Sequence, residues 1–138
     1  MNLFDNTQKH TQELEALIAN ADRAITEENF SHLMNFYSEN GSLVVKDGLH
    51  VHGKENLKKA FSAIAEFFNH SLQVSQGAVK VIFGEDCALV LAETILSAQM
   101  QDGTSFNTVR DATYVFKLID GRWLCVIDNS YGTSLLKS

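Results

Sequence analysis

Apolar residues recur at helical spacing in the first half of the chain. We predict helices over residues 7–28 and 29–37, and a third that opens at residues 53–56, because their apolar positions repeat every three or four residues. The first stripe is Leu14, Leu17, Ile18, Ala21, Ala24 and Ile25; the second is Phe30, Leu33, Met34 and Tyr37; the third is Leu57, Phe61, Ile64 and Phe68. Asp5 or Asn6 is expected to cap the first helix and Asn29 the second, and Asn40-Gly41 is expected to end the second helix and turn the chain.

The second half predicts strands. Residues 42–46 and 49–52 form a short hairpin around Asp47-Gly48, and four longer strands cover residues 71–83, 87–101, 105–119 and 122–130. The longer strands are joined by short links at residues 84–86, 102–103 and 120–121, so neighbours along the chain should pair antiparallel. Helices followed by a mostly antiparallel sheet define an α+β fold, and the length suits one domain over residues 1–138.

The two Asp-Gly links also predict a register, because each can close a two-residue hairpin loop. That register places Trp123, Cys125, Ile127 and Asn129 on one face, whereas Thr94, Asp128 and Ser130 fall on the other; a single bulge would exchange the faces. We assign the first face to the side covered by the helices, and the ligand pocket is then expected to contain Tyr37, Glu93, Arg110, Tyr114 and Asn129.

Glu93 stands out because it interrupts an apolar strand, where a carboxylate must be paired or hydrated. It is either half of a cross-strand ion pair with Arg110 or the polar floor of an apolar pocket.

Three further candidate positions could carry chemistry. Asp22 borders the first apolar stripe and either points inward as an acid or pairs with a cation in solvent. His70 either reaches a pocket mouth as an acid or base, or caps the third helix. His50 and His52 share one side of a strand, but no nearby Cys, Asp or Glu pattern completes a ligand set, so no metal is expected.

A partner is expected on the sheet. Residues 88–92 read Ala-Leu-Val-Leu-Ala, apolar at consecutive positions, which is typical of a strand covered on both faces. Three helices cover one face only, so we predict a homodimer packed sheet to sheet.

Composition and charge limit the kinds of partner that the protein is expected to bind. The 138 residues are 45% hydrophobic and carry a formal net charge of −6, which argues against nucleic acid or an anionic membrane. The N-terminal residues lack the apolar core of a signal peptide, so a cytoplasmic protein is expected. Cys87 and Cys125 then read as free thiols, and nothing in the sequence calls for a cofactor.

The order of these motifs resembles the NTF2-like superfamily (cystatin-like α+β cone), in particular its SnoaL-like and DUF4440 branch. The matching stretches span nearly the whole chain: Ala21-Asp22-Arg23-Ala24, residues 29–37, Gly53-Lys54-Glu55-Asn56-Leu57, Asp120-Gly121-Arg122-Trp123 and Asp128-Asn129-Ser130. The resemblance implies a curled sheet around a helix-lined cavity, usually in a homodimer. Its members include ketosteroid isomerases, polyketide cyclases, dehydratases and kinase assembly domains.

The chain departs from some of these relatives. Val45 falls where ketosteroid isomerases carry their base aspartate, and Ala21 falls near their first-helix tyrosine. Ile127 and Asn129 occupy the last strand, where relatives often carry histidines.

The sequence is therefore compatible with three functions. The first is a domain that binds a small hydrophobic or anionic ligand. The second is an isomerase, cyclase or dehydratase that uses Glu93 or Asp22 as base and His70 as acid, without a metal. The third is a homo-oligomeric assembly or partner-binding module that works through the sheet face.

Overall fold

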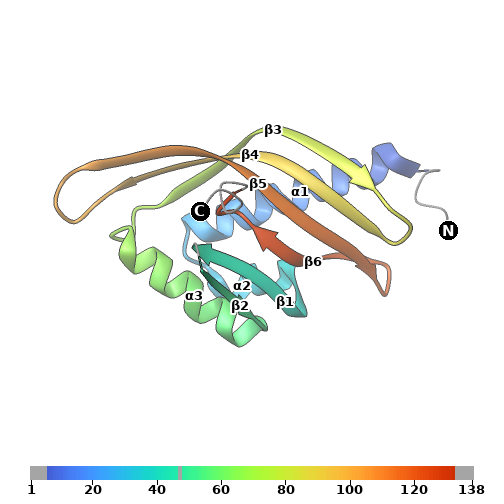
Figure 1. Ribbon diagram of the computed structural model, residues 1–138, viewed down its shortest axis with the longest axis horizontal. Coiled ribbons are helices and arrows are strands. Elements are labelled where there is room, and N and C mark those ends of the chain that lie inside the picture. Colours follow the sequence, from blue (N-terminus) through green and yellow to red (C-terminus); the bar gives the residue numbers. More distant parts are fainter. Residues whose placement is uncertain (1–5, 47, 133–138) are drawn as a thin grey trace.

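A computed structural model describes residues 6–46 and 48–132 as three helices packed on one curved sheet (Figure 1). The helices are α1 (Thr7–Thr26), α2 (Phe30–Leu33) and α3 (Lys54–Phe67). The strands are β1 (Tyr37–Lys46), β2 (Leu49–His52), β3 (Gln73–Phe83), β4 (Cys87–Gln99), β5 (Ser105–Ile119) and β6 (Arg122–Asn129). None of the described helices is long and apolar enough to cross a membrane.

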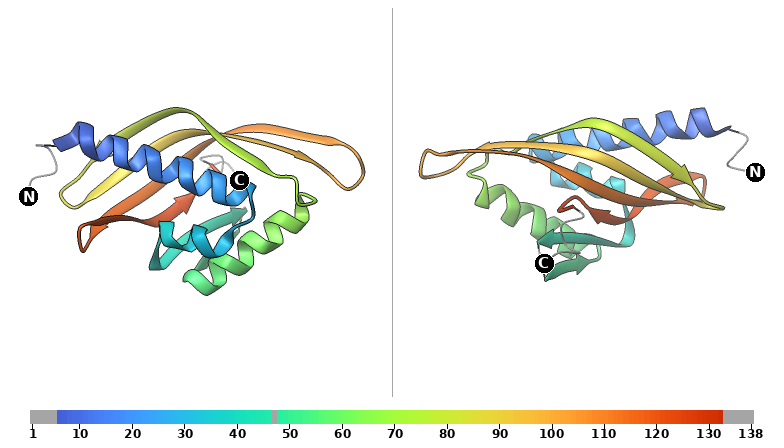
Figure 2. Two further views of the ribbon diagram at one scale, coloured as in Figure 1. Left: turned by 180° about the vertical axis from the view of Figure 1, so that it is seen from behind. Right: turned by 45° about the horizontal axis from the view of Figure 1, so that its top comes forward.

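The six strands form a single sheet in the order β2-β1-β6-β5-β4-β3. All neighbouring pairs are antiparallel except β1 and β6, which run parallel. The predicted α+β class is therefore confirmed, and the small hairpin of β1 and β2 extends the sheet beyond the four long strands. Figure 2 shows the helices on the concave side, where α1 runs along β3 and α3 packs against β1.

The predicted second helix is too long. Helix α2 ends at Leu33, a single 3-10 turn covers Met34–Phe36, and Tyr37 already begins β1. Asn40-Gly41, predicted to turn the chain, lies inside β1 instead. A Cβ at Gly41 would lie 3.1 Å from the carbonyl oxygen of Cys125, so glycine here permits the close approach of β1 to β6.

Caps and turns differ in detail. Asn6 occupies the cap position of α1 without a side-chain hydrogen bond, whereas Asn29 Oδ1 accepts from the backbone N–H of His32, as predicted. Asp5 and Asp47, the other predicted cap and turn residues, lie outside the described residues.

Two β-bulges decide which side chains face the helices. In β6, Cys125 pairs with Phe116 and Ile127 pairs with Val115, so Val126 is an extra residue without a partner. In β3, Gln76 pairs with Thr94 and Val79 with Ala92, so two residues oppose Glu93 alone. Beyond each bulge the alternation of inner and outer positions is reversed.

Candidate functional site

A cavity of about 770 Å³ lies between the inner face of the sheet and helices α1 and α3. Its walls are mostly apolar, with side chains such as Ile18, Phe36, Phe61 and Leu96. This volume falls within the ~300–1,000 Å³ typical of pockets for small organic molecules.

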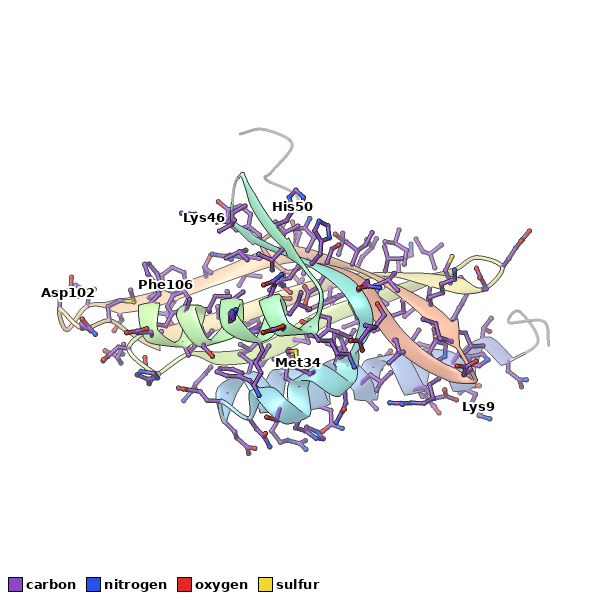
Figure 3. All side chains as sticks on the ribbon, turned by 90° about the horizontal axis from the view of Figure 1, so that it is seen from below. Lys9, Met34, Lys46, His50, Asp102 and Phe106 are labelled. Carbon is purple, nitrogen blue, oxygen red and sulfur yellow. The ribbon has the colours of Figure 1, made fainter. Side chains whose placement is uncertain are left out.

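The exposed lining residues mark the mouth of the cavity. They come from the end of the β1–β2 hairpin and from the outer side of α3: Lys46, Leu49, Asn56, Lys59, Ala63 and Phe67. Lys46 and His50 are labelled at the end of this hairpin in Figure 3, with α3 in the foreground.

Asp22 brings a carboxylate to the α1 wall of the cavity. It is only 6% exposed, and its Oδ2 accepts a hydrogen bond of 2.9 Å from Gln76 Nε2 on β3. Gln76 in turn accepts from Thr94 Oγ1 at 3.4 Å, which fixes the orientation of its amide. The helix stripe Ile18, Ala21, Asp22 and Ile25 faces the cavity as one surface, so the aspartate belongs to the inner side of α1.

A second buried carboxylate, Asp128, lies at the end of β6. Tyr37 Oη donates to its Oδ2 at 2.6 Å and Ser130 Oγ donates to its Oδ1 at 2.5 Å, so both oxygens are satisfied. The Tyr114 hydroxyl lies 3.3 Å from Ser130 Oγ and extends this cluster along the wall. All four residues line the cavity.

Both buried carboxylates have a raised pKa. Burial raises the pKa of Asp22 to about 6; the bond from Gln76 opposes this rise, and the charge of Asp128 adds to it. Burial also raises the pKa of Asp128, against the lowering effect of Ser130 and Tyr37. A carboxyl group whose pKa approaches neutral pH is suited to accept and return a proton.

Four of the residues singled out in the sequence do line this cavity. They are Tyr37, Arg110, Tyr114 and Asp22. Arg110 lies opposite Thr94 in the β4–β5 register, and its Cζ is 5.0 Å from the centre of the Tyr131 ring.

The other three do not line it. Glu93 is on the outer face opposite Asp111, where its Oε1 accepts from the backbone N–H of Ala78 in the β3 bulge at 2.9 Å. Glu93 therefore forms no ion pair with Arg110 and does not line the cavity. Asn129 lies opposite Thr113, and its amide bonds to the backbone of Gly132.

His70 occupies the turn after α3, with Nδ1 3.0 Å from Glu28 Oε1. Its backbone N–H donates to the Ala65 carbonyl at the end of α3, in keeping with the predicted capping role.

The predicted register missed Asp128, Ser130, Thr94 and Gln76. At the β4–β5 turn, Gln99 pairs with Ser105, so the loop holds five residues rather than two. This moves every β4–β5 pair by one position and brings Thr94 inward with Arg110. At β6 the bulge at Val126 turns Ile127 outward and Asp128 inward. A polar Asp-Asn-Ser run at the end of an otherwise apolar strand was the one available sign of such a reversal.

His50 and His52 remain outside this arrangement. Their ring centroids are 5.4 Å apart, and His52 Nδ1 lies 2.7 Å from Ser42 Oγ. In residues 6–46 and 48–132, no group of three His, Cys, Asp or Glu side chains is placed to hold a metal ion.

Solved structures with the same architecture define the fold class. A protein of unknown function from Mycobacterium tuberculosis superposes with a TM-score of 0.79 at 15% identity, covering 91% of this chain and 72% of its own. An NTF2-like protein with a cystatin-like fold from Novosphingobium aromaticivorans gives 0.76 at 15% identity, covering 88% and 80% of the two chains. A proposed scytalone dehydratase from the same organism gives 0.76 at 14%, covering 91% and 85%. The fold is therefore that of the NTF2-like, cystatin-like proteins.

The family follows from the sequence itself. The SnoaL-like domain family matches residues 14–127, and this chain belongs to that family. Curated proteins yielded no match.

Proposed function

We propose that this domain binds a small, mostly apolar molecule that carries at least one oxygen, in the cavity between α1, α3 and the sheet. The proposal is supported by apolar walls around two hydrogen-bonded polar clusters, one at Asp22 and one at Asp128. Apolar walls supply affinity, and the few polar groups orient the ligand.

We further propose that the bound molecule undergoes proton transfer, as in an isomerase, cyclase or dehydratase. The observation that carries this step is the carboxylate of Asp22, buried at the cavity wall with a pKa raised to about 6. Such a group is mostly ionised at neutral pH yet is more basic than an exposed aspartate. The similarity in fold to a proposed scytalone dehydratase agrees with this reaction class.

A carbon acid tests proton transfer without knowledge of the natural substrate. In deuterated buffer, we expect the protein to accelerate exchange of the α-protons of 2-tetralone, followed by NMR. The rate should rise as the pH increases through about 6, because the base must be ionised. Asp22→Asn should lower the accelerated rate by ~10²-fold or more, the usual contribution of a general base.

Glu15→Gln is the matched control, because Glu15 is exposed on the same helix. It should leave the exchange rate unchanged. Equal rates with wild-type protein, the Asp22→Asn variant and buffer alone would exclude proton transfer from this ketone to Asp22.

The outer face of the sheet favours a second function, association with another copy of the chain. Large apolar side chains gather there, including Leu89, Leu91, Ile95, Val109 and Ile127, each exposed by 37% or more. Paired strands bring them together, since Leu89 lies opposite Val115 and Ile95 opposite Val109. We propose that a second copy of the chain covers this patch, because exposed apolar patches of this kind mark interfaces.

A further inference from the structure

The cavity carries positive charge that its own carboxylates do not neutralise. Arg110, Lys46 and Lys59 all line it, although the chain as a whole has a formal net charge of −6. Among the described residues, no carboxylate lies within ion-pair distance of any of the three. Burial and the charge of Asp128 raise the pKa of Asp22, and the hydrogen bond from Gln76 opposes this rise.

The position of Arg110 is fixed by the sheet, but its N–H donors lack hydrogen-bond acceptors among the described residues. The β4–β5 register sets it opposite Thr94, on the inner face, and its guanidinium lies over the ring of Tyr131. This contact places the cation over the ring but supplies no oxygen or nitrogen acceptor for the guanidinium N–H donors. Arg110 is half-buried and has no hydrogen-bond acceptor among the described residues, an arrangement that an anionic ligand would complete.

We propose that the cavity is selective for a mostly apolar molecule with a terminal carboxylate, which Arg110 binds and which Lys59 at the mouth attracts. This deepens the ligand-binding function proposed above and rests on it. A planar guanidinium presents two parallel N–H donors that match the two oxygens of a carboxylate. A phosphate monoester offers similar oxygens but carries nearly twice the charge, which costs more to desolvate among apolar walls.

Three probes with one apolar chain separate these chemistries: decanoate, decanamide and decyl phosphate, titrated calorimetrically at pH 7.5. Wild-type protein should bind decanoate at least about tenfold more tightly than decanamide, as expected for hydrogen bonds to a charged group. Arg110→Gln should remove this preference by weakening decanoate about tenfold, while decanamide changes less than about twofold.

Arg122→Gln serves as the control, since Arg122 is exposed at the start of β6 and does not line the cavity. It removes the same charge and should leave the preference intact. If Arg110→Gln does not fold, Arg110→Lys keeps the charge but loses the planar pair of donors, and should lower the preference several-fold.

The outcomes separate the two proposals. Equal binding of decanoate and decanamide by wild-type protein would overturn the carboxylate inference and leave ligand binding intact. Tighter binding of decyl phosphate would overturn the choice of carboxylate. Failure of all three probes to bind would overturn both the inference and the ligand-binding function on which it rests.

Discussion

Neutralising Asp22 should make the folded protein more stable at neutral pH. Burial raises the pKa of this side chain from 3.8 to about 6, which means that the folded state holds the ionised form less favourably than the unfolded chain does. Each pKa unit corresponds to about 1.36 kcal/mol, so ionised Asp22 lowers the free energy of unfolding by about 3 kcal/mol at pH 7 and above.

Asp22→Asn removes that cost while keeping the shape of the side chain. Its amide oxygen can still accept the hydrogen bond that Gln76 Nε2 donates to Asp22 Oδ2. The new NH₂ group needs an acceptor of its own, so we expect a net gain of about 1–3 kcal/mol at pH 7.5. For a domain of this size, such a gain raises Tm by about 3–10 °C.

The stability difference between the two proteins should depend on pH in a direction that identifies Asp22 as its cause. Between about pH 4 and 6 the folded wild-type protein binds more protons at position 22 than the unfolded chain, so this contribution to stability falls as the pH rises. The advantage of Asp22→Asn should therefore be absent near pH 4 and complete above about pH 6.

Urea unfolding of both proteins at equal concentration, from pH 4 to 8, measures this difference. Glu15→Gln, exposed on the same helix, should stay within about 0.5 kcal/mol of wild type. An Asp22→Asn variant less stable than wild type at pH 7.5, or an advantage that does not vary with pH, would refute the reasoning.

Three further changes test other parts of the structure. Tyr37→Phe removes the hydroxyl that donates to Asp128 and should lower the free energy of unfolding by about 1–3 kcal/mol in urea; a loss below 0.5 kcal/mol would contradict the buried bond. Glu93→Ala removes the acceptor for the Ala78 N–H and should cost about 1 kcal/mol, again by urea unfolding, with decanoate binding unchanged; impaired binding would argue against its place on the outer face. Leu91→Lys should convert the proposed dimer to a monomer in sedimentation equilibrium, and a monomeric wild-type protein would exclude that dimer.

Periodicity predicted most of the fold because a helix or strand buried on one face repeats its apolar residues in every turn or pleat. Helices α1 and α3 and strands β2 and β5 follow the predicted pattern closely. Tyr37 was misplaced because it continues the apolar spacing of α2 by coincidence. Its burial comes from pairing with β6, a contact between residues 88 positions apart that a local pattern does not contain.

The candidate site was harder to predict than the fold. Tyr37, Arg110 and Tyr114, expected in the pocket, line the cavity, and so does Asp22, for which the sequence left an inward and a solvent-paired position open. Glu93 was conspicuous as a carboxylate in an apolar strand, but it serves the backbone of the β3 bulge. Face assignments near β6 failed because a bulge adds one unpaired residue, and the polar run at residues 128–130 does not by itself locate it.

The extra residue at Val126 has a consequence for how such a cavity can change over time. Deleting Val126 would remove the bulge but leave Ile127 opposite Val115 and Asp128 opposite Tyr114, so Asp128 would stay inside. Straightening the bulge with Val126 kept in the strand would instead bring Ile127 inward and carry Asp128 to the outside. A one-residue slip of the end of β6 would thus exchange a carboxylate for a hydrocarbon in the cavity wall, a larger chemical step than most substitutions there can make. In this architecture, whether one strand residue is paired or bulged out decides which side chains a ligand meets.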